Sequence, residues 1–93
     1  MKCKAYISNH CEESMIAKEI LDKEGYDVEY INITDSMENL KEFLQLRDKE
    51  PFFEEAKQNN RVGVPTLVFG DKEIFVDVES GVDVALIDPY FKK

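Results

Sequence analysis

Residues 2–25, KCKAYISNHCEESMIAKEILDKEG, contain the pattern that decides the fold. Side chains alternate over residues 2–8 well enough to predict a strand. Residues 11–24 then carry an apolar stripe with the spacing of a helix, and Gly25 is a natural C-terminal stop. Residues 27–33 are rich in β-branched and aromatic side chains, which predicts a second strand. We expect the two strands to pair in parallel, because a helix connects them.

The rest of the sequence continues the succession of helices and strands. A capping cluster precedes a helix that Pro51 interrupts, Gly70-Asp71 predicts a tight hairpin turn, and the last helix is expected to end near Pro89. The further elements are a helix between Ser36 and Pro51, a helix over 51–58, strands at 66–69 and 73–76, and a helix over 82–88. We therefore predict one α/β domain over residues 1–93, with a mixed four-stranded sheet flanked by helices on both faces.

The composition indicates an ordinary globular domain that carries excess negative charge. Apolar residues make up 43% and charged residues 34%, and the formal net charge is −8. Phosphate backbones and anionic membrane surfaces would repel such a chain, so we expect neither nucleic acid nor membrane as a partner. No apolar run approaches the ~20 residues of a membrane span, and no signal peptide is recognisable. We expect a cytoplasmic protein whose two cysteines are free thiols.

Cys11 is the candidate nucleophile. It stands where the first predicted strand ends and the helix begins, close to the free N–H groups and the positive end of the helix dipole. Both favour the thiolate, which is the reactive form of cysteine, whereas the neighbouring Glu12 and Glu13 oppose it. On position alone, a small apolar residue at a helix start remains the alternative.

Ser14 occupies the position at which a second thiol would stand. It shares a helical face with Cys11, so Cys-Glu-Glu-Ser is a C-x-x-C arrangement with oxygen in place of sulfur. A serine cannot release a mixed disulfide, although an ordinary first-turn serine explains the residue equally well. Cys3 is separated from Ser8 by about 16 Å of strand, beyond the ~7 Å that a disulfide tolerates. We therefore expect a buried Cys3, no disulfide between the two cysteines and no zinc site.

A second group of candidate residues precedes the predicted strand at 66–69. If the Val64–Pro65 bond is cis, the Val64 backbone can pair with an extended, peptide-like ligand. Arg61 and Lys57 lie just before this loop and can bind a carboxylate. Residues 80–83 resemble a turn into a helix start, which can bind an anion. Solvated charges and an ordinary N-cap are the alternatives at these positions.

Taken in order, these motifs resemble the glutaredoxin family, which has a thioredoxin-like fold. The resemblance extends from residue 3 to about residue 87, and residues 39–57 are similar to small bacterial glutaredoxin-related proteins. The motifs that carry it are Tyr6, Cys11-Glu12-Glu13-Ser14, Ala17-Lys18, Arg61, Val64-Pro65-Thr66, Gly70-Asp71 and Ser80-Gly81-Val82-Asp83.

The resemblance implies a monothiol disulfide oxidoreductase with glutathione as co-substrate and no metal. Its partners would be glutathione or another small thiol, and glutathionylated or disulfide-bonded proteins. The implied roles are a mixed disulfide with glutathione on Cys11, backbone pairing of the tripeptide with Val64 beside a cis Pro65, binding of the γ-glutamyl end by Val82 and Asp83, and binding of the glycine carboxylate by Arg61, with help from Lys57.

The sequence also departs from the family pattern around the thiol. Ser8 stands where a lysine is common, Glu12-Glu13 replaces the usual uncharged pair, and Ser80 replaces the first glycine of Gly-Gly. The first two changes remove positive charge or add negative charge near the thiol, and they predict weaker binding of anionic glutathione. Two other functions stay open: a redox-inactive binding module on a thioredoxin-like frame, and a protein that shares an iron–sulfur cluster through Cys11 and glutathione.

Overall fold

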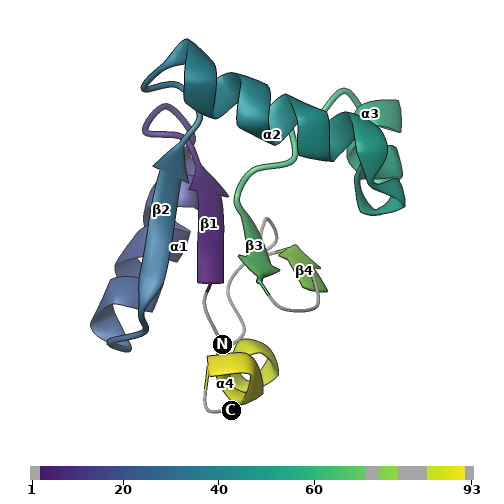
Figure 1. Cartoon of the computed structure of the whole chain (residues 1–93). Coiled ribbons are helices and arrows are strands. Elements are labelled where there is room, and N and C mark those ends of the chain that lie inside the picture. The colour runs from purple at the N-terminus through teal and green to yellow at the C-terminus, as the bar shows by residue number, and fades with distance from the viewer. Residues whose placement is uncertain (1–2, 71–73, 78–83, 92–93) are drawn as a thin grey trace.

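The chain folds as a βαβ unit followed by a second, mostly antiparallel half (Figure 1). The computed structural model describes residues 3–70, 74–77 and 84–91. The first half comprises β1 (Cys3–Ile7), α1 (Glu12–Lys23) and β2 (Val28–Asn32). The second half comprises α2 (Met37–Lys49), the 3-10 helix η1 (Pro51–Phe53), α3 (Glu54–Gln58), β3 (Thr66–Phe69), β4 (Ile74–Asp77) and α4 (Val84–Phe91).

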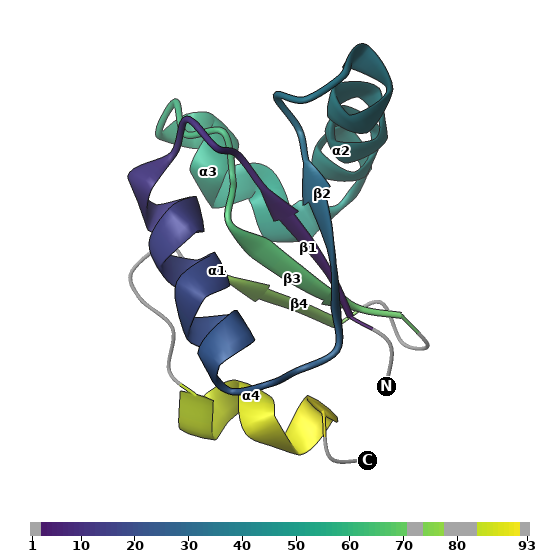
Figure 2. The ribbon, with the colours of Figure 1, turned by 90° about the vertical axis from the view of Figure 1, so that its left-hand side faces the viewer.

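The sheet is mixed, with the strand order β2-β1-β3-β4. β1 pairs with β2 in parallel, as the crossover through α1 requires, and β3 runs antiparallel to both β1 and β4. In the pairing of β1 with β3, Tyr6 lies opposite Thr66. Figure 2 shows α1 and α2 on opposite sides of the strands. The predicted α/β class, with helices on both faces of a mixed sheet, is confirmed and is the arrangement of a thioredoxin-like fold.

Each face of the sheet has its own apolar core. Because side chains alternate along a strand, Cys3 and Tyr6 of β1 belong to different cores. The core on the side of α1 and α4 contains Cys3, Ala5, Ile7, Ala17, Leu21, Leu67, Phe69 and Ile87. The core on the side of α2 contains Tyr6, Ile31, Ile33, Phe43, Phe53 and Val64. Burying one large apolar side chain stabilises a fold by about 1.5–3 kcal/mol, so packing on both faces holds β1 in its orientation.

The last helix continues past Pro89, where the sequence predicts its end. Pro89 lies inside α4 and removes one helical hydrogen bond. The residues that follow it gain aromatic contacts, since the Phe91 ring stacks on Tyr26 with centroids 4.0 Å apart and Tyr90 lies 4.9 Å from Phe69. Tertiary packing outweighs the local preference here, and the predicted end of the helix is wrong.

The register of β3 with β4 differs from the one that a two-residue turn at Gly70-Asp71 would give, and Asp71 itself lies outside the described residues. β3 ends at Phe69, β4 begins at Ile74, and these two residues pair with each other. A two-residue turn would instead set Lys72 opposite the buried Phe69, where a charge is costly. The observed register places an apolar residue opposite Phe69.

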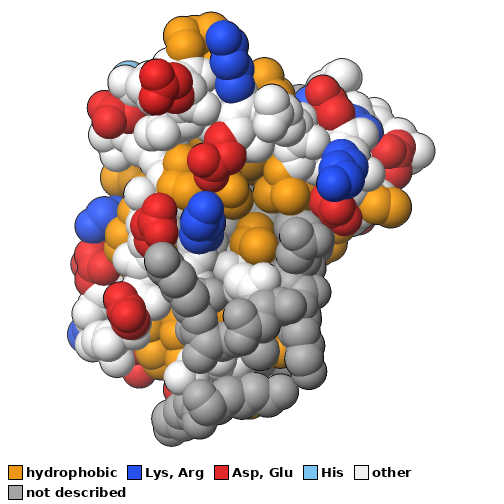
Figure 3. Space-filling model, viewed as in Figure 1, with side chains coloured by type: hydrophobic (Ala, Val, Ile, Leu, Met, Phe, Trp, Pro, Cys, Tyr) orange, Lys and Arg blue, Asp and Glu red, His pale blue; other side chains and the backbone are white. Residues whose placement is uncertain are grey.

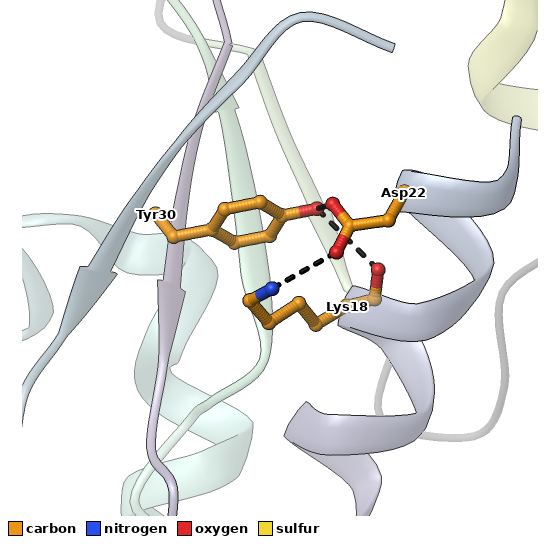
Figure 4. Close-up of polar contacts among 3 residues, drawn as sticks. All are labelled: Lys18, Asp22 and Tyr30. Atoms are coloured by element: carbon orange, nitrogen blue, oxygen red, sulfur yellow. Dashed lines mark hydrogen bonds and ion pairs between the residues drawn. The ribbon is translucent and has the colours of Figure 1, made fainter. Parts of the chain in front are cut away.

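Lys18, Asp22 and Tyr30 fasten α1 to the edge strand β2 (Figure 4). The Lys18 ammonium lies 2.9 Å from Asp22 Oδ2 and 4.8 Å from the centroid of the Tyr30 ring. The Tyr30 hydroxyl donates to Asp22 Oδ1 at 2.8 Å. The hydrogen bond from Lys18, and then that from Tyr30, hold the pKa of the Asp22 carboxyl below its usual value. Burial, and then the Asp22 carboxylate, raise the pKa of Tyr30.

A second set of hydrogen bonds joins the loop after β1 to the loop after β2. The Thr34 hydroxyl donates to Asn32 Oδ1 at 2.8 Å and lies 3.0 Å from the Ser8 hydroxyl. Ser8 accepts the His10 amide at its hydroxyl (3.1 Å) and the Cys11 amide at its carbonyl (3.0 Å). Because Ser8 is buried, these bonds fix the backbone that leads into α1.

We predict that Asp22→Asn lowers the free energy of unfolding at pH 7, because it removes the charged acceptor of two hydrogen bonds. Since the pKa of Asp22 is lowered in the folded state, its carboxylate stabilises the fold above the ordinary value of 3.8 and loses this effect as the pH falls below it. Urea unfolding at pH 7 and pH 3 should show a difference from the wild type that shrinks at the lower pH. Asp48→Asn, an exposed carboxylate on α2, is the matched control. A difference independent of pH would contradict the prediction.

We also predict that Thr34→Val loosens the loop before Cys11. The substitution keeps the shape of the side chain but removes both hydroxyl bonds, which should lower the free energy of unfolding by about 1 kcal/mol. Amide hydrogen exchange at His10 and Cys11, followed by NMR, should become faster. Thr34→Ser retains the hydroxyl and should behave like the wild type. Unchanged exchange in the valine variant would show that this hydroxyl does not hold the loop.

Candidate active site

Cys11 is the N-cap residue of α1. Its backbone is extended (φ −111°, ψ 117°), and its carbonyl accepts the Met15 amide at 3.2 Å. The helix therefore begins one residue later than predicted. This position sets the Cys11 side chain at the positive end of the helix dipole. The side chain is partly exposed, as a nucleophile must be.

The Cys11 thiol contacts the Glu13 carboxylate. Cys11 Sγ donates to Glu13 Oε2 at 3.5 Å, and Glu13 is exposed in the first turn of α1, next to Glu12. A carboxylate in this position accepts a hydrogen bond from the neutral thiol and repels the thiolate. The helix dipole and the carboxylate thus act on the sulfur in opposite directions.

Cys11 shares a pocket of about 350 Å³ with the loop that precedes β3. Two residues that the sequence analysis singled out in that loop, Arg61 and Val64, line the same pocket as the thiol. The complete lining consists of Ser8, His10, Cys11, Ile33, Thr34, Arg61, Val62 and Val64. The fold therefore brings the predicted nucleophile together with two of the predicted ligand-binding residues.

The backbone around Val64 has the form that the resemblance implies. The Val64–Pro65 peptide bond is cis, and both side chains are buried. Val64 makes no hydrogen bond to another residue within the described ranges, and it lines the pocket that contains Cys11. Gly63 has φ +108°, and a Cβ there would lie 3.1 Å from Phe53 Cδ1. Glycine is therefore required where the chain turns into this segment.

Arg61 and Lys57 take different places in the structure. Arg61 lines the pocket, and its guanidinium lies 3.2 Å from Glu55 Oε1. The backbone carbonyl of Arg61 accepts a hydrogen bond from Arg47 Nη2 at 2.7 Å. Lys57 Nζ instead pairs with Glu54 at 2.9 Å and does not line the pocket. The expectation that Lys57 assists Arg61 is not supported, because its i,i+3 partner holds it along α3.

The second active-site position and the second cysteine are both buried. Ser14 lies on the face of α1 that packs on the sheet, and its hydroxyl has no hydrogen-bond partner among the residues described. Cys3 is buried at the far end of β1, as predicted, and burial raises the pKa of its thiol to about 12. Both cysteines are free thiols. Cys11 therefore has no neighbouring thiol that could resolve a mixed disulfide.

Two of the predicted binding residues are not described by the structure, and three residues that were not predicted line the pocket. Val82 and Asp83 lie outside the described residues, so their role stays a prediction. Sequence analysis missed Ile33, Thr34 and Val62, which line the pocket. Val62 is 52% exposed, and an isolated apolar residue in a polar loop was a signal that could have identified it.

The surface charges, the metal-binding side chains and the lengths of the helices were compared with what other kinds of site require. On the face drawn in Figure 3, acidic and basic side chains are intermixed over the described residues. No group of three or more His, Cys, Asp or Glu side chains in the described part of the chain is arranged to hold a metal ion. Among the helices described, none is long and apolar enough to cross a membrane.

Comparisons with known proteins agree with this geometry. The family model for glutaredoxin matches residues 3–74. An uncharacterized protein of Haemophilus influenzae (strain ATCC 51907 / DSM 11121 / KW20 / Rd) is 34% identical over 58 residues, which cover 62% of this chain and 67% of that protein. No solved structure gives a significant match. Because the family model spans most of the chain, including Cys11 and the Val64–Pro65 bond, the chain belongs to the glutaredoxin family.

Proposed function

We propose that the chain is a thiol–disulfide oxidoreductase in which Cys11 is the sole nucleophile and glutathione is the co-substrate. The observation that supports this most directly is the position of Cys11 at the start of α1, in one pocket with Arg61 and Val64. A short thiol peptide needs a helix-start cysteine to react with, a free backbone edge to pair with and a cation for its carboxylate. Membership of the glutaredoxin family, which is a family of thiol–disulfide oxidoreductases, supports the same function.

The proposed reaction consists of two disulfide exchanges. The Cys11 thiolate attacks the glutathione sulfur of a protein–glutathione mixed disulfide, whose S–S bond breaks, and the protein leaves as a thiolate that takes a proton from water. A second glutathione thiolate then attacks the glutathione sulfur held by Cys11. This step releases the Cys11 thiolate and glutathione disulfide, so that the sulfur of the incoming glutathione is oxidised from thiol to disulfide and the protein sulfur of the substrate is reduced from disulfide to thiol.

The binding of glutathione follows from the same pocket. The Val64 backbone would pair with the cysteine of the tripeptide, and Arg61 would approach its glycine carboxylate. The resemblance to the family assigns the γ-glutamyl end to Val82 and Asp83. Arg61 also interacts with Glu55, and Glu13 lies beside the thiol, so we expect weaker binding than in relatives with a positive charge at the site.

Two other functions have less support. An iron–sulfur cluster held by Cys11 would bring an anionic group to a sulfur that already lies 3.5 Å from the Glu13 carboxylate. A redox-inactive binding module would leave a partly exposed thiol in the pocket without a use. The oxidoreductase needs a compartment in which glutathione keeps thiols reduced, so we place its activity in the cytoplasm.

We predict that Cys11→Ser abolishes the reduction of a glutathionylated peptide by glutathione, because the variant cannot form the mixed disulfide. The rate of this reduction is measured by monitoring the release of the peptide through its fluorescence. Cys3→Ala should retain the wild-type rate, since the buried thiol does not reach the pocket. A Cys11→Ser variant as active as the wild type would refute the proposal. A wild type that binds the peptide but does not reduce it would favour a binding module, and a coloured protein after anaerobic iron–sulfur reconstitution with glutathione would favour cluster binding.

We further predict that Ser14→Cys creates a dithiol site. The Ser14 hydroxyl is buried and has no partner among the residues that the structure describes, so a less polar thiol of similar size should be tolerated, and it would lie one helical turn from Cys11. After treatment with glutathione disulfide, intact-mass analysis should show the wild type with one added glutathione and the variant with two hydrogens lost. Ala17→Cys is the matched control, because a rise of about 9 Å along the helix keeps residue 17 out of disulfide reach. A Ser14→Cys variant that only gains glutathione would contradict the prediction.

A further inference from the structure

The Glu13 carboxylate faces the atom at which the proposed reaction occurs. Glu13 Oε2 lies 3.5 Å from Cys11 Sγ, and Glu13 is exposed in the first turn of α1. A substrate sulfur that bonds to Cys11 at an S–S length of about 2 Å comes within roughly 6 Å of this carboxylate. Charged groups that flank an approaching disulfide therefore interact with Glu13 at short range.

Carboxylates outnumber cations among the described residues around this thiol. Glu12 adds a second exposed carboxylate next to Glu13. Arg61 is the cationic residue that lines the pocket in the described structure, and its guanidinium lies 3.2 Å from Glu55. The chain as a whole carries a net charge of −8. Carboxylates therefore predominate among the charged side chains described around the thiol, and they attract positively charged groups that approach it.

We infer that Glu13 is a specificity-determining residue that directs Cys11 toward disulfides flanked by ammonium or guanidinium groups. The inference rests on the proposed function and narrows its substrates to mixed disulfides on protein cysteines that have Lys or Arg neighbours. Coulomb attraction to Glu13 accelerates the attack of Cys11 on a cationic disulfide, and repulsion by Glu13 slows the attack on an anionic one. The rate with a neutral disulfide does not depend on this interaction.

A comparison of substrates separates this selection from any effect on the thiol itself. Removing the charge of Glu13 also acts on the reactivity of the Cys11 sulfur itself, because the two groups lie 3.5 Å apart. That change multiplies the rate with every disulfide by the same factor. The ratio of two rates with disulfides of opposite charge cancels the factor and reports selection alone.

The test measures the second-order rate of mixed-disulfide formation on Cys11 with three small disulfides, followed by intact-mass analysis. Cystamine is a dication, hydroxyethyl disulfide is neutral and dithiodiglycolate is a dianion. The wild type should react fastest with cystamine. At about 0.1 M salt Glu13→Gln should lower the ratio of the cystamine rate to the dithiodiglycolate rate by about three- to tenfold, and about 1 M salt should remove most of this difference.

Glu19→Gln is the matched control, because it removes the same charge from an exposed position further along α1. The rise from residue 11 to residue 19 is about 12 Å, which exceeds the Debye length of about 10 Å at 0.1 M salt. At that ionic strength the ratio of rates in Glu19→Gln should stay within about twofold of the wild type. An equal fall in both variants would overturn the assignment to Glu13.

The possible outcomes distinguish this inference from the proposed function. An unchanged ratio in Glu13→Gln, with all three disulfides still reacting, overturns the inference and leaves the proposed function intact. A wild type that fails to react even with hydroxyethyl disulfide overturns the proposed function. Two glutathionylated peptides, identical except for Lys or Glu on both sides of the cysteine, extend the test to peptide substrates. The Lys peptide should be reduced faster by the wild type, and equal rates would overturn the assigned substrate class.

Discussion

The antiparallel register between β1 and β3 is the constraint on which the site depends. It sets Tyr6 opposite Thr66, so the loop that leaves β1 and the loop that enters β3 meet at one edge of the sheet. The first loop supplies Cys11 and the second supplies Val64 to the same pocket. A slip of one residue would turn every side chain of β1 to the other face, which the two apolar cores resist. Core packing thereby also fixes the distance between thiol and binding loop.

The same packing explains why the thiol lacks a nearby cation from β1. Ser8, where related proteins often have a lysine, is buried and hydrogen-bonded to Thr34 and to the backbone that leads into α1. A charged side chain buried there would need a partner to offset its desolvation. The neutral hydroxyl of Ser8 instead orders the loop through its hydrogen bonds. The N-terminus of α1 is then the group that stabilises a negatively charged sulfur. Glu13 opposes that stabilisation, so the environment of Cys11 is a balance of local charges and not a single strong effect.

The features that depend on local spacing could be predicted from the sequence, and those that depend on distant contacts could not. Alternation along β1 correctly indicated the burial of Cys3, and the apolar stripe of α1 indicated its length within a residue at each end. The end of α4 at Pro89 was wrong because aromatic rings from β3 and from the loop before β2 hold the residues beyond it. The place of Lys57 and the role of Thr34 depend on partners that side-chain packing selects. A single sequence carries no direct signal for such pairings.

Ser14 indicates that packing stability alone does not account for the site. Its hydroxyl is buried and has no hydrogen-bond partner within the described part of the chain, which costs about 1–3 kcal/mol that alanine would avoid. Because oxygen cannot form a disulfide, a mixed disulfide on Cys11 in the proposed reaction has no internal route of release and persists until an external thiol arrives. That thiol must approach past Glu13, whose charge repels anionic thiolates at the moment of attack. Ser14 provides no internal thiol to release the mixed disulfide, and Glu13 slows its release by an external thiol. In the proposed reaction, both residues therefore favour a long-lived mixed disulfide over rapid turnover.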